Sequence, residues 1–497
     1  MKNKFYITTS IAYTNAEPHI NYALELIQAD VLNRYHKLQG QETWFLTGTD
    51  EHGTKIVRTA EAQGKAPKEF VDAIAERFQL LPKALGVEND DFIRTTDQVR
   101  HWPTAQKLWN IMQEKGDLYK KEYEGLYCVG HEAFIKKSEL VNGMCAIHKT
   151  KPDVVKEENW FFKLSNYAQE IKKRIKVDEL KILPVSKKNE IINLLDDAED
   201  ISFSRPSKDL SWGIPVPNDP SQTMYVWVDA LSNYISALGY DSDSENFKKF
   251  WPADVHLIGK DILRFHAMIW PAILLSTGID LPKAVYVHGF ITIDGEKMSK
   301  SIGNVIDPFF LAEKYSSDVL RYFLIREISS DEDGDFSEEK LIARYNGDLA
   351  NGLGNLVARV ATLIDNNFSD GFEYDQKLIA SETNQTTHDL LTKYQSSIEN
   401  FKLHEALIAI WELIAYADKY VNHNKPWVLV KENPEEFKSV MTNLVEMIYQ
   451  ITKVLSPFIP ETADKISSVF DLKKEEGLDG RKINIKKGPV LFPRLQD

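Results

Sequence analysis

The sequence lacks any apolar run long enough to cross a membrane. The longest, Phe265 to Leu275, is broken by His266 and Pro271, and it falls short of the roughly 18 residues that a membrane-spanning helix needs. The apolar run at the N-terminus reaches Glu17 without the small-residue pattern of a cleavage site, so a signal peptide is not expected either. These absences predict a cytoplasmic protein.

Cysteine is also scarce, and acidic residues outnumber basic ones. Two cysteines in 497 residues argue against a disulfide framework and leave metal ligation or burial as their uses. The net charge of −14 argues against nucleic acid as a partner, because phosphate backbones are bound largely through Lys and Arg. A local basic face stays compatible with RNA, since salt screens acidic surface beyond about 8 Å.

Internal repeats of about 20 to 50 residues and low-complexity segments are missing, which argues against a solenoid. The chain has 43% hydrophobic and 27% charged residues, as is ordinary for a folded protein. Its length exceeds the size at which a single core keeps growing. We therefore expect two to four domains.

The first 115 residues have the pattern of a parallel α/β unit. A β-branched and aromatic run, Phe5 to Thr9, precedes apolar residues at helical spacing that end before Gly40. A second strand-like run, Trp44 to Thr47, leads into the loop from Gly48 to Gly53. Because ligand-binding groups lie at the carboxyl ends of such strands, residues 1–115 are predicted to form half of a nucleotide-binding fold.

The α/β pattern is then interrupted and resumes. Residues 116–224 carry short strand-like runs, Gly-containing turns and a Pro-rich end, as expected of an inserted domain. Residues 225–340 are predicted to complete the split fold, with an amphipathic helix from Ile262 to Ser276. Strand-like runs occur there at Tyr225 to Val228, Val255 to Ile258 and Ala284 to Phe290.

Residues 341–497 are almost wholly helical in pattern and are predicted to form an antiparallel helix bundle. The tail after about residue 472 is Lys-rich and poorly patterned. Apolar residues share one helix face at Leu403, Leu407, Ile410, Ile414 and Ala417, and another at Val440, Leu444, Met447, Ile451 and Val454.

The strongest local motif is Lys297-Met298-Ser299-Lys300-Ser301, reached through the turn Asp294-Gly295. Two lysines and two hydroxyls on one loop suit closure over a triphosphate, because they neutralise charge that develops on a departing pyrophosphate. A solvated surface loop has the same composition. The motif alone leaves both interpretations open.

A second motif, Pro18 to Tyr22, lies at the start of the first predicted helix. Helix N-termini attract phosphate, and a histidine there can donate to the phosphates of ATP. On its own, a histidine at this position is more often a helix-start or packing residue.

Together, in this order and about 280 residues apart, the two motifs resemble the HIGH and KMSKS signatures of class I aminoacyl-tRNA synthetases. Over nearly the whole chain the sequence resembles the methionyl-tRNA synthetase family. The resemblance implies an α/β fold: a split Rossmann-like catalytic domain with an inserted connective-peptide subdomain, then an all-α anticodon-binding bundle. The matching segments are Ala12 to His19, Leu46 to Gly53, Tyr225 to Ala230, Ile258 to Ile262 with His266, and Val287 to Phe290.

The resemblance also implies the reaction. The enzyme would activate L-methionine with Mg²⁺-bound ATP to methionyl-adenylate and pyrophosphate, then transfer methionyl to the 3′ end of tRNA(Met). Catalytic roles fall on His19, Lys297 and Lys300, and ATP binding also involves Tyr22 and Ser299. Asp50 would bind the α-amino group, and Asp261 a ribose or amino group. The methionine side chain would be enclosed by Tyr13, Trp227, Ala230, Leu231, Tyr234, Ile262 and His266.

Without the resemblance, the pocket aromatics fit an ordinary core. One departure concerns the first signature, where Asn21 stands in place of the usual Gly and Tyr22 in place of the second His. A side chain at residue 21 crowds the face that adenine approaches, and Tyr22 carries no positive charge near pH 7. The departure therefore bears on the role of Tyr22 and not on the enzyme class.

Both cysteines fall in the predicted insertion, as Cys128-x2-His131 and Cys145-x2-His148. This spacing predicts a tetrahedral structural zinc site. The family often has Cys where His131 stands, and some members have lost the metal, so a metal-free remnant is the alternative.

In the helical region, Asn355 and Arg359 share one helix face, and Trp427 follows Pro426 in another segment. The resemblance assigns these residues to the CAU anticodon, which suits planar groups that stack on single-stranded bases. Without it, Trp427 fits a buried packing residue, and Asn355 and Arg359 fit a solvated face.

Two other classes of function stay as rivals. One is a class I synthetase for Cys, Val, Ile or Leu, although the large editing insertion of the last three is absent. The other is an inactive paralogue that binds tRNA or another partner, which Asn21 and Tyr22 motivate. Nothing in the sequence resembles the additional C-terminal tRNA-binding domain that dimerises some family members, so a monomer is expected.

Overall fold

The computed structural model describes residues 3–129, 133–135, 140–146, 149–298, 304–329, 332–472, 477–486 and 488–495. The chain divides into two compact units. The first contains Met1–Lys83 and Val87–His288, and the second contains Ala84–Gly86 and Gly289–Asp497. In the described part of the chain no helix is long and apolar enough to span a membrane.

The first unit is built on a seven-stranded parallel sheet in the order β10-β16-β15-β1-β3-β2, with β4 also paired to β3. Its central strands are fully buried on both faces, as parallel sheets require. The strands are β1 Lys4–Thr9, β2 Ala12–Tyr13, β3 Glu42–Asp50, β4 Asp91–Arg94, β10 Lys181–Leu183, β15 Val255–Gly259 and β16 Ala284–His288.

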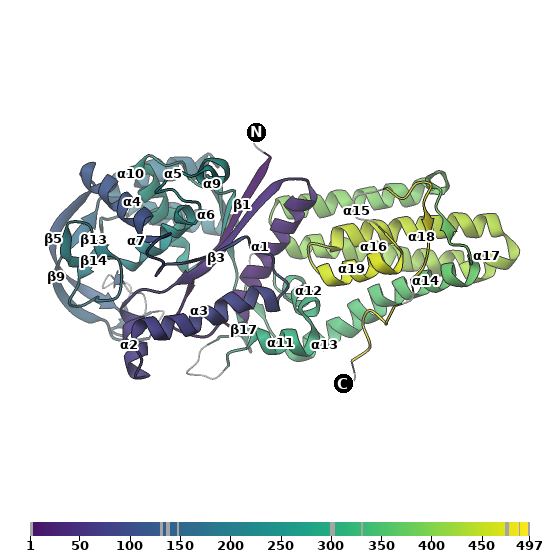
Figure 1. Cartoon of the computed structure of the whole chain (residues 1–497), viewed down its shortest axis with the longest axis horizontal. Coiled ribbons are helices and arrows are strands. Elements are labelled where there is room, and N and C mark those ends of the chain that lie inside the picture. The colour runs from purple at the N-terminus through teal and green to yellow at the C-terminus, as the bar shows by residue number, and fades with distance from the viewer. Residues whose placement is uncertain are drawn as a thin grey trace. The chain divides into compact units, whose positions relative to one another are not determined.

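Helix α1, Ile20–Leu38, packs against β1 and β3 (Figure 1). It ends where Gly40 takes a left-handed φ of 74°. The other principal helices of this unit are α2 Thr54–Ala62, α3 Pro67–Ala84, α4 Trp102–Glu114, α5 Ala168–Lys176, α6 Val185–Asp196 and α10 Trp270–Thr277. The predicted first strand, first helix and second strand are all confirmed.

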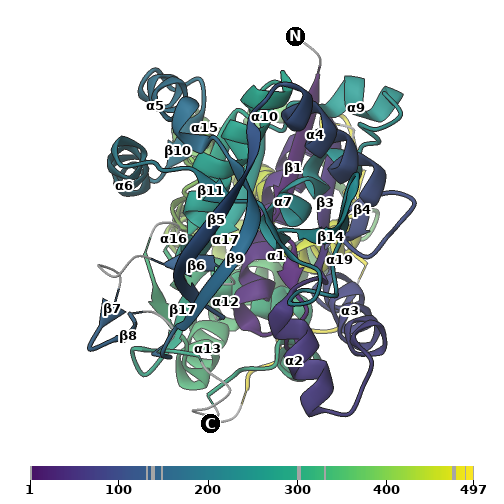
Figure 2. The ribbon, with the colours of Figure 1, turned by 90° about the vertical axis from the view of Figure 1, so that its left-hand side faces the viewer.

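The insertion forms its own antiparallel sheet, in which the long strands β5 Leu118–Cys128 and β9 Asp153–Phe162 lie side by side (Figure 2). Strands β6 Ala133–Ile135 and β11 Ile201–Ser202 flank this pair. A smaller sheet contains β12 Ser204–Pro206, β14 Asp219–Met224 and β13 Pro215–Val216. The expectation of short strands and turns is met only in part, because β5 and β9 have 11 and 10 residues and helices α5 and α6 also lie in this segment.

Two features of this unit differ from the sequence-based expectation. Strand β10 lies within residues 116–224 but pairs with β16 in the parallel sheet, so the chain returns to the sheet before that segment ends. The strand predicted from Tyr225 to Val228 is wrong, because the chain forms helix α7, Val226–Leu231, there. A short apolar run buried on all sides gives no period that separates strand from helix.

The second unit begins with a small sheet of β17 Ile291–Ile293, β18 Glu296–Lys297 and β19 Gly334–Asp335. Helices α11 Pro308–Tyr315, α12 Ser317–Glu327 and α13 Glu338–Arg344 follow, and a π-helical stretch leads into α14, Asn355–Asn367. The bundle contains α15 Ser381–Glu399, α16 Leu403–Asn424, α17 Pro426–Glu432, α18 Pro434–Leu455 and α19 Pro460–Val469.

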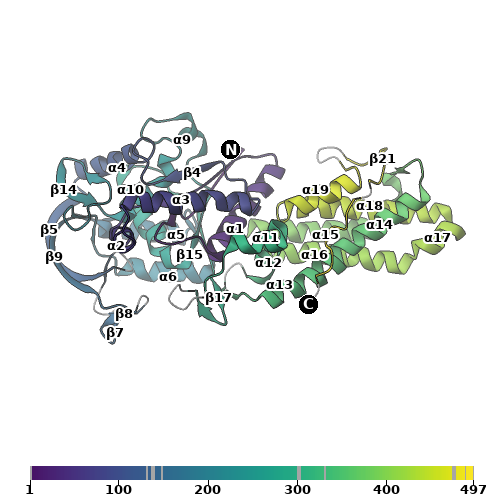
Figure 3. The ribbon, with the colours of Figure 1, turned by 60° about the horizontal axis from the view of Figure 1, so that its bottom comes forward.

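Helices α14, α16 and α18 run side by side in the bundle (Figure 3). The apolar faces predicted on α16 and α18 are buried apart from Val454, and the predicted bundle is confirmed. The tail contributes β21, Lys482–Ile483, which pairs with β20, Phe372–Glu373.

The compact units divide at residue 288, whereas the sequence pattern changes at about 340. The fully buried Arg321 of α12 explains this difference, since its guanidinium donates to the carbonyls of Phe458 and Pro457 at 2.7 and 2.8 Å. Buried guanidinium groups need such acceptors. The segment after His288 is therefore bonded to the bundle, a contact that local sequence pattern does not reveal.

Candidate active site

The carboxyl end of β3 brings Tyr13 and Asp50 together. These residues are register partners across β2 and β3, and Asp50 is 7% exposed. Thr14 closes the arrangement, because its N–H and its hydroxyl both donate to the Asp50 carbonyl, at 3.0 and 3.1 Å. A carboxylate therefore lies where parallel α/β sheets bind ligands, at the carboxyl edge.

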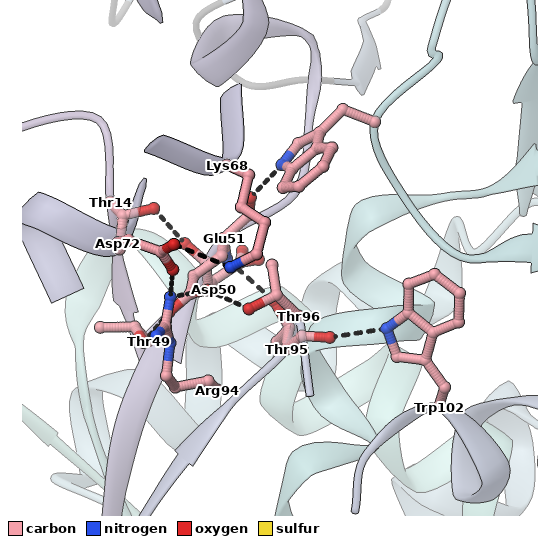
Figure 4. A network of polar contacts seen from close by, with 11 residues as sticks. Thr14, Thr49, Asp50, Glu51, Lys68, Asp72, Arg94, Thr95, Thr96 and Trp102 are labelled. Carbon is pink, nitrogen blue, oxygen red and sulfur yellow. Dashed lines mark hydrogen bonds and ion pairs between the residues drawn. The ribbon is translucent and has the colours of Figure 1, made fainter. Parts of the chain in front are cut away.

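The next residue, Glu51, is buried completely and ion-paired (Figure 4). Arg94 of β4 donates to both of its carboxylate oxygens, at 2.6 and 2.8 Å, and Thr49 donates to one of them at 2.6 Å. Arg94 also reaches Asp72 of α3 at 2.6 Å, and Asp72 accepts from Lys68 at 2.7 Å. A forked guanidinium pair of this kind fixes the direction of both side chains.

The backbone of the same loop is fixed as well. The Glu51 N–H donates to the Thr95 hydroxyl at 2.9 Å, and the Glu51 carbonyl accepts from the Trp212 indole at 2.6 Å. Gly48 has no room for a side chain, because a Cβ there would lie 2.1 Å from the Ile93 carbonyl oxygen. The loop after β3 is thus held by groups from β4 and from the segment before β13.

A second wall comes from α7, from α8 Asn233–Ser236 and from the π-helical segment Phe265–Ile269. Tyr234 donates to His266 Nε2 at 2.6 Å, and His266 Nδ1 donates to the Ile262 carbonyl at 3.0 Å. A carbonyl only accepts, so this network sets the His266 tautomer. The Trp227 ring stacks on Phe265 at 3.7 Å, and Ala230 and Leu231 are buried beside it.

The Tyr234 and His266 side chains of this wall are uncharged at neutral pH. Burial lowers the pKa of His266 to about 4, although its hydrogen bond to Ile262 opposes the shift. Burial also raises the pKa of Tyr234, and Glu25 adds to that rise. The structure therefore brings the predicted pocket residues Trp227, Tyr234, Ile262 and His266 together, and Ala230 and Leu231 are buried in the same short helix as Trp227.

His19 is the N-cap residue of α1, and its Nδ1 accepts from the Asn21 N–H at 3.4 Å. The expected place at the helix start is confirmed. The rings of His19 and Tyr22 are 4.7 Å apart, and Tyr22 meets the edge of Phe78 at 5.0 Å. Burial, followed by the charge of Asp261, raises the pKa of Tyr22. Its hydroxyl is therefore a neutral hydrogen-bonding group at physiological pH.

The lysine motif follows the β17–β18 hairpin. Asp294 and Gly295 form its turn with φ values of 53° and 73°, as predicted from the Asp-Gly pair. Asp335 supports the hairpin by accepting from the Gly295 N–H and the Thr292 hydroxyl, both at 2.9 Å. The backbone of Lys297 pairs with Thr292, whereas Ser299, Lys300 and Ser301 lie outside the described residues.

Cys128 ends β5, and Cys145 ends β8, Met144–Cys145; both are buried in one cluster with Ile135. The Lys149 N–H donates to the Cys145 carbonyl at 2.9 Å. His131 and His148 lie outside the described residues. Within the described ranges, no three His, Cys, Asp or Glu side chains form a metal-binding group.

On the bundle, Asn355 begins α14 and is exposed, and Arg359 follows one turn later. The Arg359 guanidinium lies 5.9 Å from the centre of the Trp427 ring and is held by Asp418 and Asn422, each at 2.8 Å. Trp427 is 47% exposed, so the alternative of a buried packing residue is wrong. A shallow hollow of about 310 Å³ is lined by Arg359, Trp427, Ala358, Thr362 and Leu363.

Several residues of the site were missed from the sequence. Arg94 and Phe265 lie in no motif that was singled out, and His101 is distant in sequence from every predicted site residue. His52 and Asp229 lie inside recognised segments but had no assigned role. The signal for His52 and Asp229 was their position two residues after Asp50 and Trp227, although sequence spacing does not show which side chains meet.

Models of known families match both parts of the chain. The model described as tRNA synthetases class I (M) matches residues 5–140 and 135–361. The model described as the anticodon-binding domain of tRNA ligase matches residues 381–486. Together these matches cover most of the sequence.

Individual relatives agree with the family models. The chain is 44% identical to a methionine-tRNA ligase of Thermotoga maritima, over 93% of this chain and 74% of the relative. It is 42% identical to a methionine-tRNA ligase of Rhizobium meliloti, over 93% and 90%. The solved Mycobacterium tuberculosis methionyl-tRNA synthetase in complex with methionyl-adenylate matches with a TM-score of 0.94 and 37% identity, over 99% of this chain and 100% of that chain.

The neutral state of His266 predicts a pH-dependent loss of stability. The unfolded chain binds a proton at this histidine below about pH 6.5, whereas the folded chain binds it only near pH 4. Stability is therefore lost as the pH falls through this window. His266→Gln keeps one donor and one acceptor but does not titrate. As the pH falls, we therefore expect the free energy of unfolding of this variant to decrease by about 1 kcal/mol less per pH unit than that of the wild type.

Urea unfolding at pH 7, 6, 5 and 4.5 measures this slope. The exposed His423 provides a matched control, because His423→Gln should leave the wild-type slope in place. Equal slopes for wild type and His266→Gln would mean that His266 is protonated in the folded protein.

Proposed function

The chain belongs to the methionyl-tRNA synthetase family of class I tRNA synthetases, and we propose that the residues at the carboxyl edge of its parallel sheet bind methionine and ATP. The protein is a methionine-tRNA ligase, which activates methionine with ATP and transfers it to tRNA. The assignment of individual residues to these steps is our proposal.

In the first step, a carboxylate oxygen of methionine attacks the α-phosphorus of ATP. The new P–O bond forms methionyl-adenylate, and the bond to the bridging oxygen breaks to release pyrophosphate. In the second step, a hydroxyl of the terminal ribose of tRNA attacks the methionyl carbonyl, and AMP leaves. Both steps are transfers between bound reactants, so positioning and stabilisation of phosphate charge are the main tasks of the protein.

For methionine, the observation that carries the proposal is the buried Asp50 carboxylate at the sheet edge, together with a wall in the same unit whose Tyr234 and His266 side chains are uncharged. Asp50 would accept from the α-ammonium group, because a buried carboxylate binds a cation most strongly. A thioether is polarisable and a poor acceptor, which suits contact with rings and shape. Tyr13, Trp227, Ala230, Leu231, Tyr234, Ile262 and His266 would enclose it.

For ATP, His19 would donate to the phosphates from the start of α1, where the helix dipole favours negative charge. Tyr22 would add one neutral hydrogen bond in place of the histidine of the usual signature. Asp261 would contact a ribose or amino group. Lys297, Ser299 and Lys300 would bind the triphosphate of the Mg²⁺ complex, with the lysines neutralising charge on the leaving pyrophosphate.

We also assign Cys128, His131, Cys145 and His148 to a structural zinc ion. The donor set fits, because two thiolates and two imidazoles are a common tetrahedral zinc shell. The burial of both cysteines in one small cluster supports the assignment. Bound zinc would link β5 to the hairpin formed by β7, Leu140–Val141, and β8. It would stabilise this hairpin, whose two strands are short.

The anticodon of tRNA(Met) would bind at Asn355, Arg359 and Trp427. Ion pairing to Asp418 keeps the Arg359 guanidinium beside the exposed Trp427 ring, and the two planar groups offer surfaces for unstacked bases.

Residues 1–115 and 225–340 would form the catalytic domain, 116–224 the connective peptide, and 341–497 the anticodon-binding domain. We propose a cytoplasmic monomer.

ATP–pyrophosphate exchange on the purified protein tests the methionine site. We expect exchange with methionine, and none with cysteine, leucine, isoleucine or valine. Asp50→Asn should raise the KM for methionine about 100-fold, because it removes the charge opposite the ammonium group. Exchange with none of the amino acids, in folded protein, would favour an inactive tRNA-binding paralogue.

Aminoacylation of tRNA(Met) tests the anticodon surface. Trp427→Ala should raise the KM for tRNA about tenfold, because stacking on one base contributes about 1–3 kcal/mol, and should leave methionine-dependent exchange unchanged. Phe310→Ala, which removes another exposed aromatic ring, is the control and should not alter either quantity. An unchanged KM for tRNA in Trp427→Ala would refute this surface.

A further inference from the structure

A buried carboxylate with no assigned contact to substrate lies within the helix that carries Trp227. Asp229 of α7 is 1% exposed, and both of its oxygens are bonded. Its Oδ2 accepts from His52 Nδ1 at 2.6 Å, and its Oδ1 accepts from His101 Nε2 at 2.8 Å. The two histidines are also buried, at 2% and 0% exposure.

The carboxylate is charged. Burial alone raises the pKa of Asp229, but His52 and His101 together hold it below its ordinary value. An ionised carboxylate only accepts hydrogen bonds, so each imidazole presents an N–H to it. Breaking such a buried arrangement leaves a charge without a partner, which is far more costly than losing an exposed ion pair.

Two of these three residues, His52 and Asp229, come from segments that form the proposed methionine pocket. His52 is two residues after Asp50, in the loop held by Glu51. Asp229 is two residues after Trp227 and directly precedes Ala230. The hydrogen bond from His52 to Asp229 therefore links the segment that contains Asp50 directly to helix α7, which contains Trp227.

His101 extends this link to the next helix. Its Nδ1 is 2.9 Å from the Ser236 hydroxyl in α8, the helix that also carries Tyr234. Helix α7 has six residues and α8 has four. Helices this short are not stable alone, so tertiary bonds must set their positions.

We propose that Asp229 is a positioning residue for methionine, which through His52 and His101 holds the α7 and α8 wall at a fixed distance from Asp50. This inference rests on the methionine pocket proposed above. It adds to that pocket a group that does not touch the substrate. A purely structural role for Asp229 would lower stability without a selective effect on either substrate.

The test is Asp229→Asn in ATP–pyrophosphate exchange, with methionine and ATP varied separately. Asparagine has nearly the same shape but only one accepting oxygen, so one imidazole loses its acceptor. We expect the KM for methionine to rise about tenfold, as for the loss of one charge-assisted hydrogen bond. The KM for ATP should change less than about twofold, because the phosphates contact other residues.

Asp254→Asn is the matched control. Asp254 precedes β15 at the amino edge of the sheet, where it accepts from Lys4 at 2.8 Å and from Lys283 at 2.6 Å. The same substitution there also breaks ion pairs at a carboxylate that is largely buried. It should lower the melting temperature and leave the KM for methionine unchanged. The proposal would be overturned if Asp229→Asn raised the KM for ATP as much as the KM for methionine, or if Asp254→Asn raised the KM for methionine by the same factor as Asp229→Asn.

Asp50→Asn separates the inference from the pocket itself. If Asp50→Asn raises the KM for methionine and Asp229→Asn does not, the positioning role is refuted and the pocket stands. If neither variant raises it, the pocket assignment is refuted. Should Asp229→Asn fail to fold, Ser236→Ala decides, because it removes only the outer partner of His101. We then expect the KM for methionine to rise about threefold, and no change would overturn the proposal.

Discussion

The burial of the Glu51 carboxylate is the constraint from which the rest of the site follows. A charge without solvent needs a partner of opposite sign in good geometry, and Arg94 supplies it through two parallel hydrogen bonds. The loop is held further by three hydrogen bonds of Glu51: its carboxylate accepts from Thr49, its N–H donates to Thr95, and its carbonyl accepts from Trp212. With Glu51 fixed, its neighbours in sequence have little freedom: Asp50 stays at the sheet edge, and His52 reaches the next wall.

In the proposed methionine pocket, charge and shape are recognised by separate groups. The Asp50 carboxylate at the sheet edge suits an ammonium group, whereas the wall around Trp227 and His266 is aromatic and its His266 side chain is neutral. A substrate with a charged or strongly polar side chain would lose its hydration there without gaining a partner. Preorganisation by buried hydrogen bonds means that binding does not have to order the pocket first, which lowers the entropic cost of recognition.

The sequence predicted the parts of the molecule that depend on local pattern. Hydrophobic periodicity predicted the strand at Phe5, the helix that ends before Gly40 and the buried faces of the bundle. The strand is a continuous run of β-branched and aromatic residues, and each helix buries apolar residues that recur at helical spacing. Helix α7 and strand β10 were not predicted, since their state depends on burial among distant segments. The bonds from Glu51 to Arg94 and from Asp229 to His101 join residues far apart in sequence. Their amino-acid types gave no signal until the fold placed them together.

Hydrogen exchange in the protein without ligands tests most directly whether buried bonds order the pocket in advance. The amides of Glu51 and Gly53 donate to Thr95 and Trp212, so they should exchange about as slowly as the central strand β1. Addition of methionine should then change their exchange little. Rapid exchange of these amides without ligand, followed by strong protection when methionine is added, would show that the substrate orders the loop and would contradict this account.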